Sequence, residues 1–309
     1  MSLQTGIGPP TRPDHPIAVE FGYVTVTLVA LHLWQQLVRE SLSGVFGSPP
    51  ASGTVLVGGL ITGGLFLAGL LLFVRAYTVF RNIELELTLP SWTDLPVLGL
   101  AGLAPVVLVG LTKLVGTLTG VPSNSLTKAS VAADASVLPV VLLTGLGLLI
   151  TVPALVMVCQ LLVQESFNRV VGSSETVVLT ALVTGFAMVS NTGGPTMVPD
   201  RGKLIGVVLF ALLLVVTGYV GGRIDRARRR YLAYVPVLTL ALIIVLSRVA
   251  SVETVAGGLF AVVHLAVFGV AAYAYDRTGT PLGPALAYAS LLLANRAVVF
   301  VFETGMHSW

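Results

Sequence analysis

The most polar run on any apolar segment of this chain covers residues 163–169. In a helix, Glu165 and Arg169 stand four residues apart with the acid on the amino-terminal side, the favourable order for an ion pair. Gln164 and Asn168 lie beside them. The simplest reading is a helix end that the Glu165–Arg169 pair stabilises where it leaves a membrane. The other reading is a site at which polar groups act on a substrate within the membrane.

Three stretches resemble motifs of a known family. Gln164, Glu165 and Arg169 resemble the Glu-Glu-x-x-x-Arg motif of the CPBP family, the prokaryotic intramembrane metalloproteases of the CAAX-processing and bacteriocin-self-immunity type. Residues 273–280 and 284–288 are similar to the family's Tyr-x-Tyr-Glu-Arg-Thr-Gly turn and to the Pro-x-x-x-His that starts its last catalytic helix. The resemblance covers residues 122–302 and implies a helical membrane fold with endopeptidase chemistry.

Position by position, however, the resemblance implies that most catalytic groups are replaced. Gln164 stands where the family has the glutamate that activates water, and an amide has no carboxylate to accept a proton. Ser190 stands at the histidine of the Phe-x-x-x-His motif. Tyr288 and Leu292 stand at the two residues of the final His-x-x-x-Asn motif. The two matching residues of the first motif are those that hold the helix end in the family.

A literal Phe-x-x-x-His occurs later in the chain, with Phe260 and His264. It leaves open an alternative in which His264 is a metal ligand. One imidazole without a second nitrogen ligand or the glutamate does not make a metal site. The sequence therefore indicates no cofactor, and a divalent metal such as zinc is expected only if the protein is an active protease.

A few further polar groups fall inside apolar runs, where a charge costs a few kcal/mol unless it is paired. Asn168, His264 and Arg296 are candidates to line a polar cavity, and Lys113 lies inside the third apolar run. Cys159, the single cysteine, is expected to be a small buried hydrophobic residue.

The elements that must position these groups are transmembrane helices. Hydrophobic residues make up 55% of the chain and charged residues 10%, against about a quarter in a water-soluble domain. The apolar runs are about twenty residues long, which suits helices that cross a bilayer. We predict an all-α, polytopic bundle of roughly eight to nine spans, the fifth of which is short. Their expected ranges are 17–37, 53–80, 95–120, 137–163, 176–190, 204–222, 232–249, 257–275 and 282–302.

The polar ends of the chain and the positions of the arginines predict the topology. Residues 1–16 are expected to be a disordered cytoplasmic tail, residues 17–302 one integral membrane domain and residues 303–309 a short tail. Five arginines crowd residues 223–230, which places this loop in the cytoplasm. Nine spans then put the amino terminus inside and the carboxyl terminus outside a cell membrane. The small net charge of +3 favours no nucleic-acid partner.

Three functions remain open on this basis. The first is a catalytically impaired member of the family, a pseudoprotease that binds a transmembrane or lipidated peptide. The second is an active endopeptidase in which Glu165 serves as base and His264 as a metal ligand. The third is a transporter or channel for small solutes, with Lys113, Glu165 and Arg296 along the path.

Overall fold

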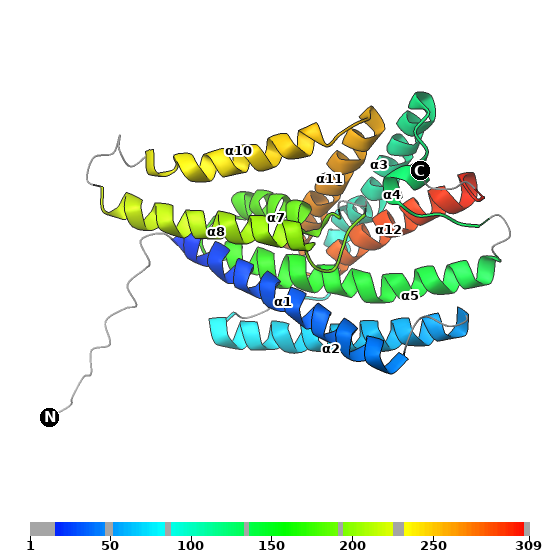
Figure 1. Ribbon diagram of the computed structural model, residues 1–309, viewed down its shortest axis with the longest axis horizontal. Coiled ribbons are helices and arrows are strands. Elements are labelled where there is room, and N and C mark those ends of the chain that lie inside the picture. Colours follow the sequence, from blue (N-terminus) through cyan, green and yellow to red (C-terminus); the bar gives the residue numbers. More distant parts are fainter. Residues whose placement is uncertain are drawn as a thin grey trace.

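The structure is a computed structural model that describes residues 16–46, 52–83, 88–132, 136–190, 194–224 and 232–305. These residues form helices and loops, with one isolated β-bridge between Val189 and Pro195. Both tails lie largely outside the described residues, as do positions 225–231 of the arginine-rich loop. The helices (Figure 1) are α1 (Pro16–Phe46), α2 (Ser52–Arg81), η1 (Trp92–Asp94), α3 (Leu95–Thr119), α4 (Ser123–Thr127), α5 (Val137–Val156), η2 (Met157–Gln164), α6 (Glu165–Asn168), α7 (Ser173–Met188), α8 (Arg201–Gly222), α10 (Val235–Ala250), α11 (Val255–Thr278) and α12 (Leu282–Phe302).

The predicted polytopic helical bundle is confirmed. Seven helical stretches are long and apolar enough to cross a membrane, when α5, η2 and α6 are taken as one stretch. All nine predicted apolar segments are helical. Two of them, α7 and α10, have 16 residues each, or about 24 Å at 1.5 Å per residue. They are therefore short for a hydrocarbon core of about 30 Å.

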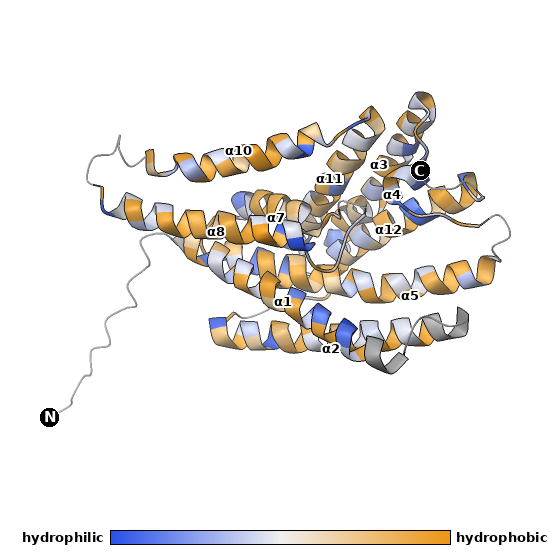
Figure 2. Ribbon diagram, viewed as in Figure 1, coloured by the Kyte–Doolittle hydropathy of each residue, from blue (hydrophilic) through white to orange (hydrophobic). Residues whose placement is uncertain are grey.

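The outer surface of the bundle is apolar. Figure 2 shows hydrophobic residues along most of the length of the long helices, and many of them are exposed. Leu72, Phe80 and Leu118, for example, are 69%, 73% and 77% exposed. Such a surface would aggregate in water, whereas lipid chains solvate it. The chain is a multi-pass membrane protein.

The helix pair α11–α12 forms a tight hairpin. Gly279 adopts a left-handed conformation at φ +61° and closes α11 with an N–H bond to Tyr275, where the sequence predicts a turn. Gly283 then brings the two helices close, since a Cβ there would lie 2.8 Å from the Ala274 Cβ. The hairpin packs against α3, and α11 also contacts α7.

The continuous helical stretch formed by α5, η2 and α6 changes from an α-helix to a π-helix and back near the centre of the bundle. Pro153 lacks an N–H group, so the regular ladder is already interrupted one turn before η2 begins. Residues Met157–Gln164 then form a π-helix, and all eight of them are buried. Wide turns of this kind occur frequently at functional sites.

Candidate functional site

A cluster of neutral polar side chains lies where η2 meets α7, α11 and α12. Gln160, Gln164 and Tyr288 are each 0% exposed. Because these residues are surrounded by apolar helices, each polar atom needs a partner within the protein. We refer to Cys159, Gln160, Gln164, Thr184 and Tyr288 as the polar cluster.

The centre of the polar cluster joins η2 to α12. The Gln160 amide nitrogen donates to the Tyr288 hydroxyl at 3.0 Å, and the Gln160 oxygen lies 3.5 Å from the same hydroxyl. The Cys159 thiol is within hydrogen-bonding reach of the hydroxyls of Tyr288 and Thr184. The Tyr288 ring packs against Phe268, with 5.3 Å between ring centroids. Neighbouring helices therefore contact both the hydroxyl and the aromatic ring of Tyr288.

Gln164, four residues after Gln160 on η2, bonds to α11. Its amide nitrogen donates to the Ala272 carbonyl oxygen at 2.9 Å. Its side-chain oxygen has no hydrogen-bond partner within the described structure, and neither do the buried hydroxyls of Thr176 and Thr180 on α7. These groups can accept or donate hydrogen bonds, but none is a general base at neutral pH.

His264 is buried on α11 and is held by its own helix. Its Nδ1 donates to the Phe260 carbonyl oxygen at 2.8 Å, and its ring lies 4.2 Å from the Phe260 ring, centroid to centroid. Nε2 has no partner among the described residues. No group of three or more His, Cys, Asp or Glu side chains in the described chain is arranged to hold a metal ion.

Glu165 and Arg169 do not form the ion pair that their spacing predicts, so this prediction is wrong. Ion pairs join Arg81 to Glu20 and Lys113 to Glu303. Arg169 is exposed and donates instead to the Arg81 carbonyl oxygen at 2.8 Å. The reason is geometric, because the α-helix ends at Asn168, and the Arg169 side chain reaches the neighbouring end of α2.

Glu165 has other partners. Its carboxylate is within hydrogen-bonding reach of the Tyr275 hydroxyl on α11, and the Asn168 amide lies 3.5 Å from it. Asn168 itself is exposed. Asn168 therefore lies at the helix end and does not line a polar cavity.

Three further predicted positions lie outside the polar cluster. Ser190 follows the end of α7, where its backbone N–H bonds to the Gly194 carbonyl oxygen; its helix ends two residues earlier. Leu292 is half-buried in the apolar core. Arg296 is exposed on α12, which corrects its expected place in a cavity, because it lies on the outward face of the helix.

The positive charge of Lys113 is paired with Glu303, directly after the end of α12. Its ammonium lies 2.5 Å from the Glu303 carboxylate. The same carboxylate accepts the backbone N–H groups of Ser123 and Asn124, at 2.7 and 2.6 Å. We refer to these contacts as the Glu303 latch, which ties α12 to α3 and to the start of α4. Lys113 thus has a structural partner.

Gln160 and Thr184 are not among the site residues predicted from the sequence, and Cys159 is predicted there only to pack. Gln160 stands four residues before Gln164, so a search for amides at helical spacing inside apolar runs would have found it. Thr184 carries no such signal, because threonine is common in membrane helices.

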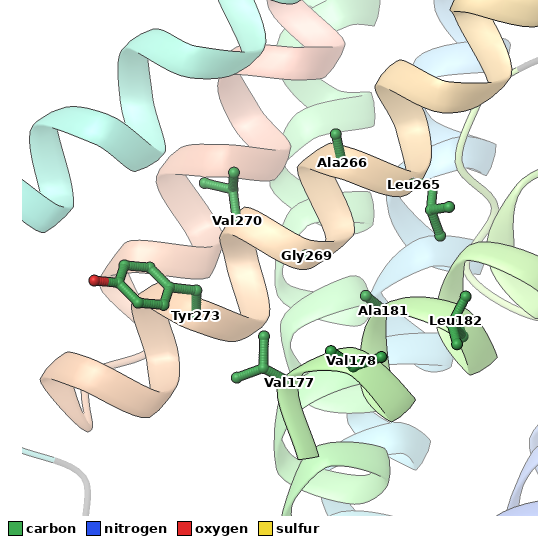
Figure 3. A pocket seen from close by; sticks show the side chains of 9 residues that line it. All are labelled: Val177, Val178, Ala181, Leu182, Leu265, Ala266, Gly269, Val270 and Tyr273. Atoms are coloured by element: carbon green, nitrogen blue, oxygen red, sulfur yellow. The ribbon is translucent and has the colours of Figure 1, made fainter. Parts of the chain in front are cut away.

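An apolar groove runs along the outer side of α7 and α11. Figure 3 shows its lining, in which Ala181, Ala266 and Gly269 leave room between larger side chains. The full lining comprises Val177, Val178, Ala181, Leu182, Leu265, Ala266, Gly269, Val270 and Tyr273. A second groove lies between α2 and α5.

No family model, no curated protein and no solved structure matches this chain.

Proposed function

We propose that this chain is a catalytically impaired CPBP-type membrane protein that binds a transmembrane or lipidated peptide and does not cleave it. One observation carries the proposal. Gln164 and Tyr288, which the motif resemblance assigns to catalytic positions far apart in the sequence, are both fully buried, and Tyr288 is hydrogen-bonded to Gln160, four residues before Gln164. A chance resemblance gives no reason for one position to lie in η2 and the other to bond to η2.

The chemistry of the cluster supports binding over hydrolysis. Peptide hydrolysis needs a base for water or a metal that activates it. Here the amide of Gln164 is fixed on a backbone carbonyl, and the hydroxyl of Tyr288 is fixed on a second amide. Both bonds lock neutral side chains in place, so the cluster stabilises the helix arrangement without supplying a proton-transfer group.

The groove along α7 and α11 offers a place for the bound segment. These two helices also carry Thr184 of the polar cluster and Ala272, the partner of Gln164. Small residues let helix backbones approach closely in a membrane, which is how transmembrane helices associate in the absence of a hydrophobic driving force. The groove therefore suits one apolar helix of a partner.

The arginines support an orientation for this binding. Arg81, Arg169 and Arg277 stand at the ends of α2, α6 and α11, and Arg169 contacts Arg81 directly. Short cytoplasmic segments accumulate arginine. This end of the bundle is accordingly the cytoplasmic one in our proposal, and the Glu303 latch lies at the other end of α12.

The proposal is tested with purified protein in nanodiscs and a panel of fluorescent single-span and prenylated peptides. We expect saturable binding, measured by energy transfer, and no peptide fragments by mass spectrometry, with or without added zinc. Val178→Trp fills the groove and should weaken binding at least about tenfold, or 1.4 kcal/mol.

Leu142→Trp is the matched control, because it makes the same change in the groove between α2 and α5, and it should leave binding within about twofold. Cleavage that disappears in Glu165→Gln would overturn the proposal in favour of an active protease. Equal binding by both tryptophan variants would show that the peptide does not bind in the groove along α7 and α11.

A further inference from the structure

The first turn of α8 combines several features that favour an anion. The 22-residue helix begins at Arg201 after Asp200, an extended residue whose side chain makes no capping bond. The first N–H groups of a helix have no partner inside it, and the helix dipole adds a partial positive charge there. Phosphate groups bind readily at such helix starts.

Lys203 lies in this same first turn and is the second, independent observation. Its side chain is buried, at 4% exposure, and its Nζ has no hydrogen-bond partner in the part of the chain that the structure describes. Side chains of a helix lean toward its amino terminus, and Asp200, directly before the helix, is one of the charged groups that act on Lys203. A buried ammonium without an anionic partner is costly.

Two charged side chains act electrostatically on Lys203. Arg248 near the end of α10 and Asp200 are the charged groups that act on it, and Arg201 adds a third basic side chain on the same turn. Arg248 also lies 5.7 Å from the centre of the Phe186 ring. Lys203 is thus close to one further cation, and its own ammonium has no hydrogen-bonded anion among the described residues.

The surroundings hold this first turn in place. His32 on α1 donates from Nδ1 to the Pro199 carbonyl oxygen at 3.1 Å, and Gln36 lies 3.0 Å from its other ring nitrogen. Next to Lys203, a Cβ at Gly202 would meet no atom within 4 Å. The surface of the first turn is therefore open at Gly202.

We propose that the first turn of α8, with Lys203 and Arg248, binds a phosphate group. The ligand is either free phosphate or the headgroup of an anionic phospholipid. Lys203 supplies a charge-assisted hydrogen bond, the open N–H groups supply further donors, and Arg248 supplies long-range attraction.

The test uses the full chain purified in a neutral detergent at constant ionic strength. One arm titrates inorganic phosphate, and the other compares nanodiscs of phosphatidylcholine with nanodiscs that also contain phosphatidylglycerol. Calorimetry gives the affinity and a thermal melt gives the ligand-dependent rise in Tm. Binding in the first arm identifies free phosphate, and binding in the second arm alone identifies a lipid headgroup.

Lys203→Met keeps the length of the side chain and removes its charge. We expect it to weaken binding at least about tenfold, while Lys203→Arg stays within about threefold. Without ligand, Lys203→Met should melt at the same temperature as the wild type or higher, because a buried charge has been removed.

Arg296→Met is the matched control, since it removes an exposed basic side chain on α12. It should bind phosphate as the wild type does. The proposal is overturned if the wild type binds neither probe, or if Lys203→Met and Arg296→Met reduce binding equally, which would indicate only a bulk effect of charge.

Discussion

Gln164 and Tyr288 show how single residues set the chemical character of the bundle centre. Both are neutral hydrogen-bonding groups with fixed partners, the Ala272 carbonyl and the Gln160 amide. An ionisable group at the same depth would need a paired charge. The centre of the bundle is therefore polar without burying a charge. Each of these two hydrogen bonds joins one pair of helices.

Tyr288→Phe tests this at the residue scale. The change removes one hydroxyl, leaves the ring packed on Phe268 and deprives Gln160 of its partner. We expect a loss of about 1 kcal/mol of unfolding free energy, since hydrogen bonds between membrane helices average below that value and an abandoned buried amide adds to it. Reversible unfolding in mixed micelles measures the loss.

Tyr273→Phe is the control for this change, because Tyr273 is on α11 and is 37% exposed. It should alter the unfolding free energy by less than about 0.5 kcal/mol. Equal effects of the two substitutions would mean that the Gln160–Tyr288 bond contributes nothing to stability.

At the scale of elements, the Glu303 latch holds three helices together at one end of the bundle. Glu303 is 1% exposed, and its carboxylate meets one ammonium and two backbone N–H groups. Burial alone would raise the pKa of Glu303, but the Lys113 ammonium and the N–H groups of Ser123 and Asn124 outweigh burial and lower this pKa from its ordinary 4.5. The latch is therefore charged at neutral pH.

Glu303→Gln should destabilise the protein by about 2 kcal/mol at pH 7, because Lys113 then lies beside a neutral amide. Since the folded-state pKa lies below the unfolded one, the contribution of the carboxylate is complete above pH 4.5 and is lost as the pH falls through the lower folded-state value. The stability difference between wild type and Glu303→Gln should therefore shrink below pH 4.5. Unfolding curves across this range measure it, and a constant difference would contradict the latch.

At the scale of the whole molecule, more arginines stand at one group of helix ends than at the other, where Arg201 and Arg248 lie near the start of α8. Arginines stand at the ends of α2, α6, α8 and α11, whereas the Glu303 latch closes the opposite end of α12. The distribution predicts that the arginine-bearing end faces the cytoplasm. This whole-molecule property decides from which side a peptide partner would be reached.

Cysteine labelling tests this orientation. In a Cys159→Ala background, Arg277→Cys and Thr304→Cys each place one thiol at an exposed position. An impermeant maleimide should label Thr304→Cys on intact cells and Arg277→Cys only after the membrane is opened. The reverse pattern would show the opposite orientation.

The sequence by itself determined the helices, because a backbone inside hydrocarbon must satisfy its own hydrogen bonds and twenty apolar residues have few alternatives. It also determined the turn at Gly279, since a left-handed residue there favours glycine. It located Gln164 and Tyr288 as two positions of interest. Each of these conclusions depends on residues close together in the chain.

Only the tertiary structure decided which polar groups meet. Helical spacing favoured a Glu165–Arg169 pair, but the α5–η2–α6 stretch ends at Asn168 and Arg169 reaches Arg81. The π-helix buries Gln160 against Tyr288, whereas Arg296 remains on an exposed face. Such contacts depend on how each helix is rotated about its axis and on the angles at which helices cross. Small changes in helical winding alter both, and the apolar composition of the sequence does not specify them.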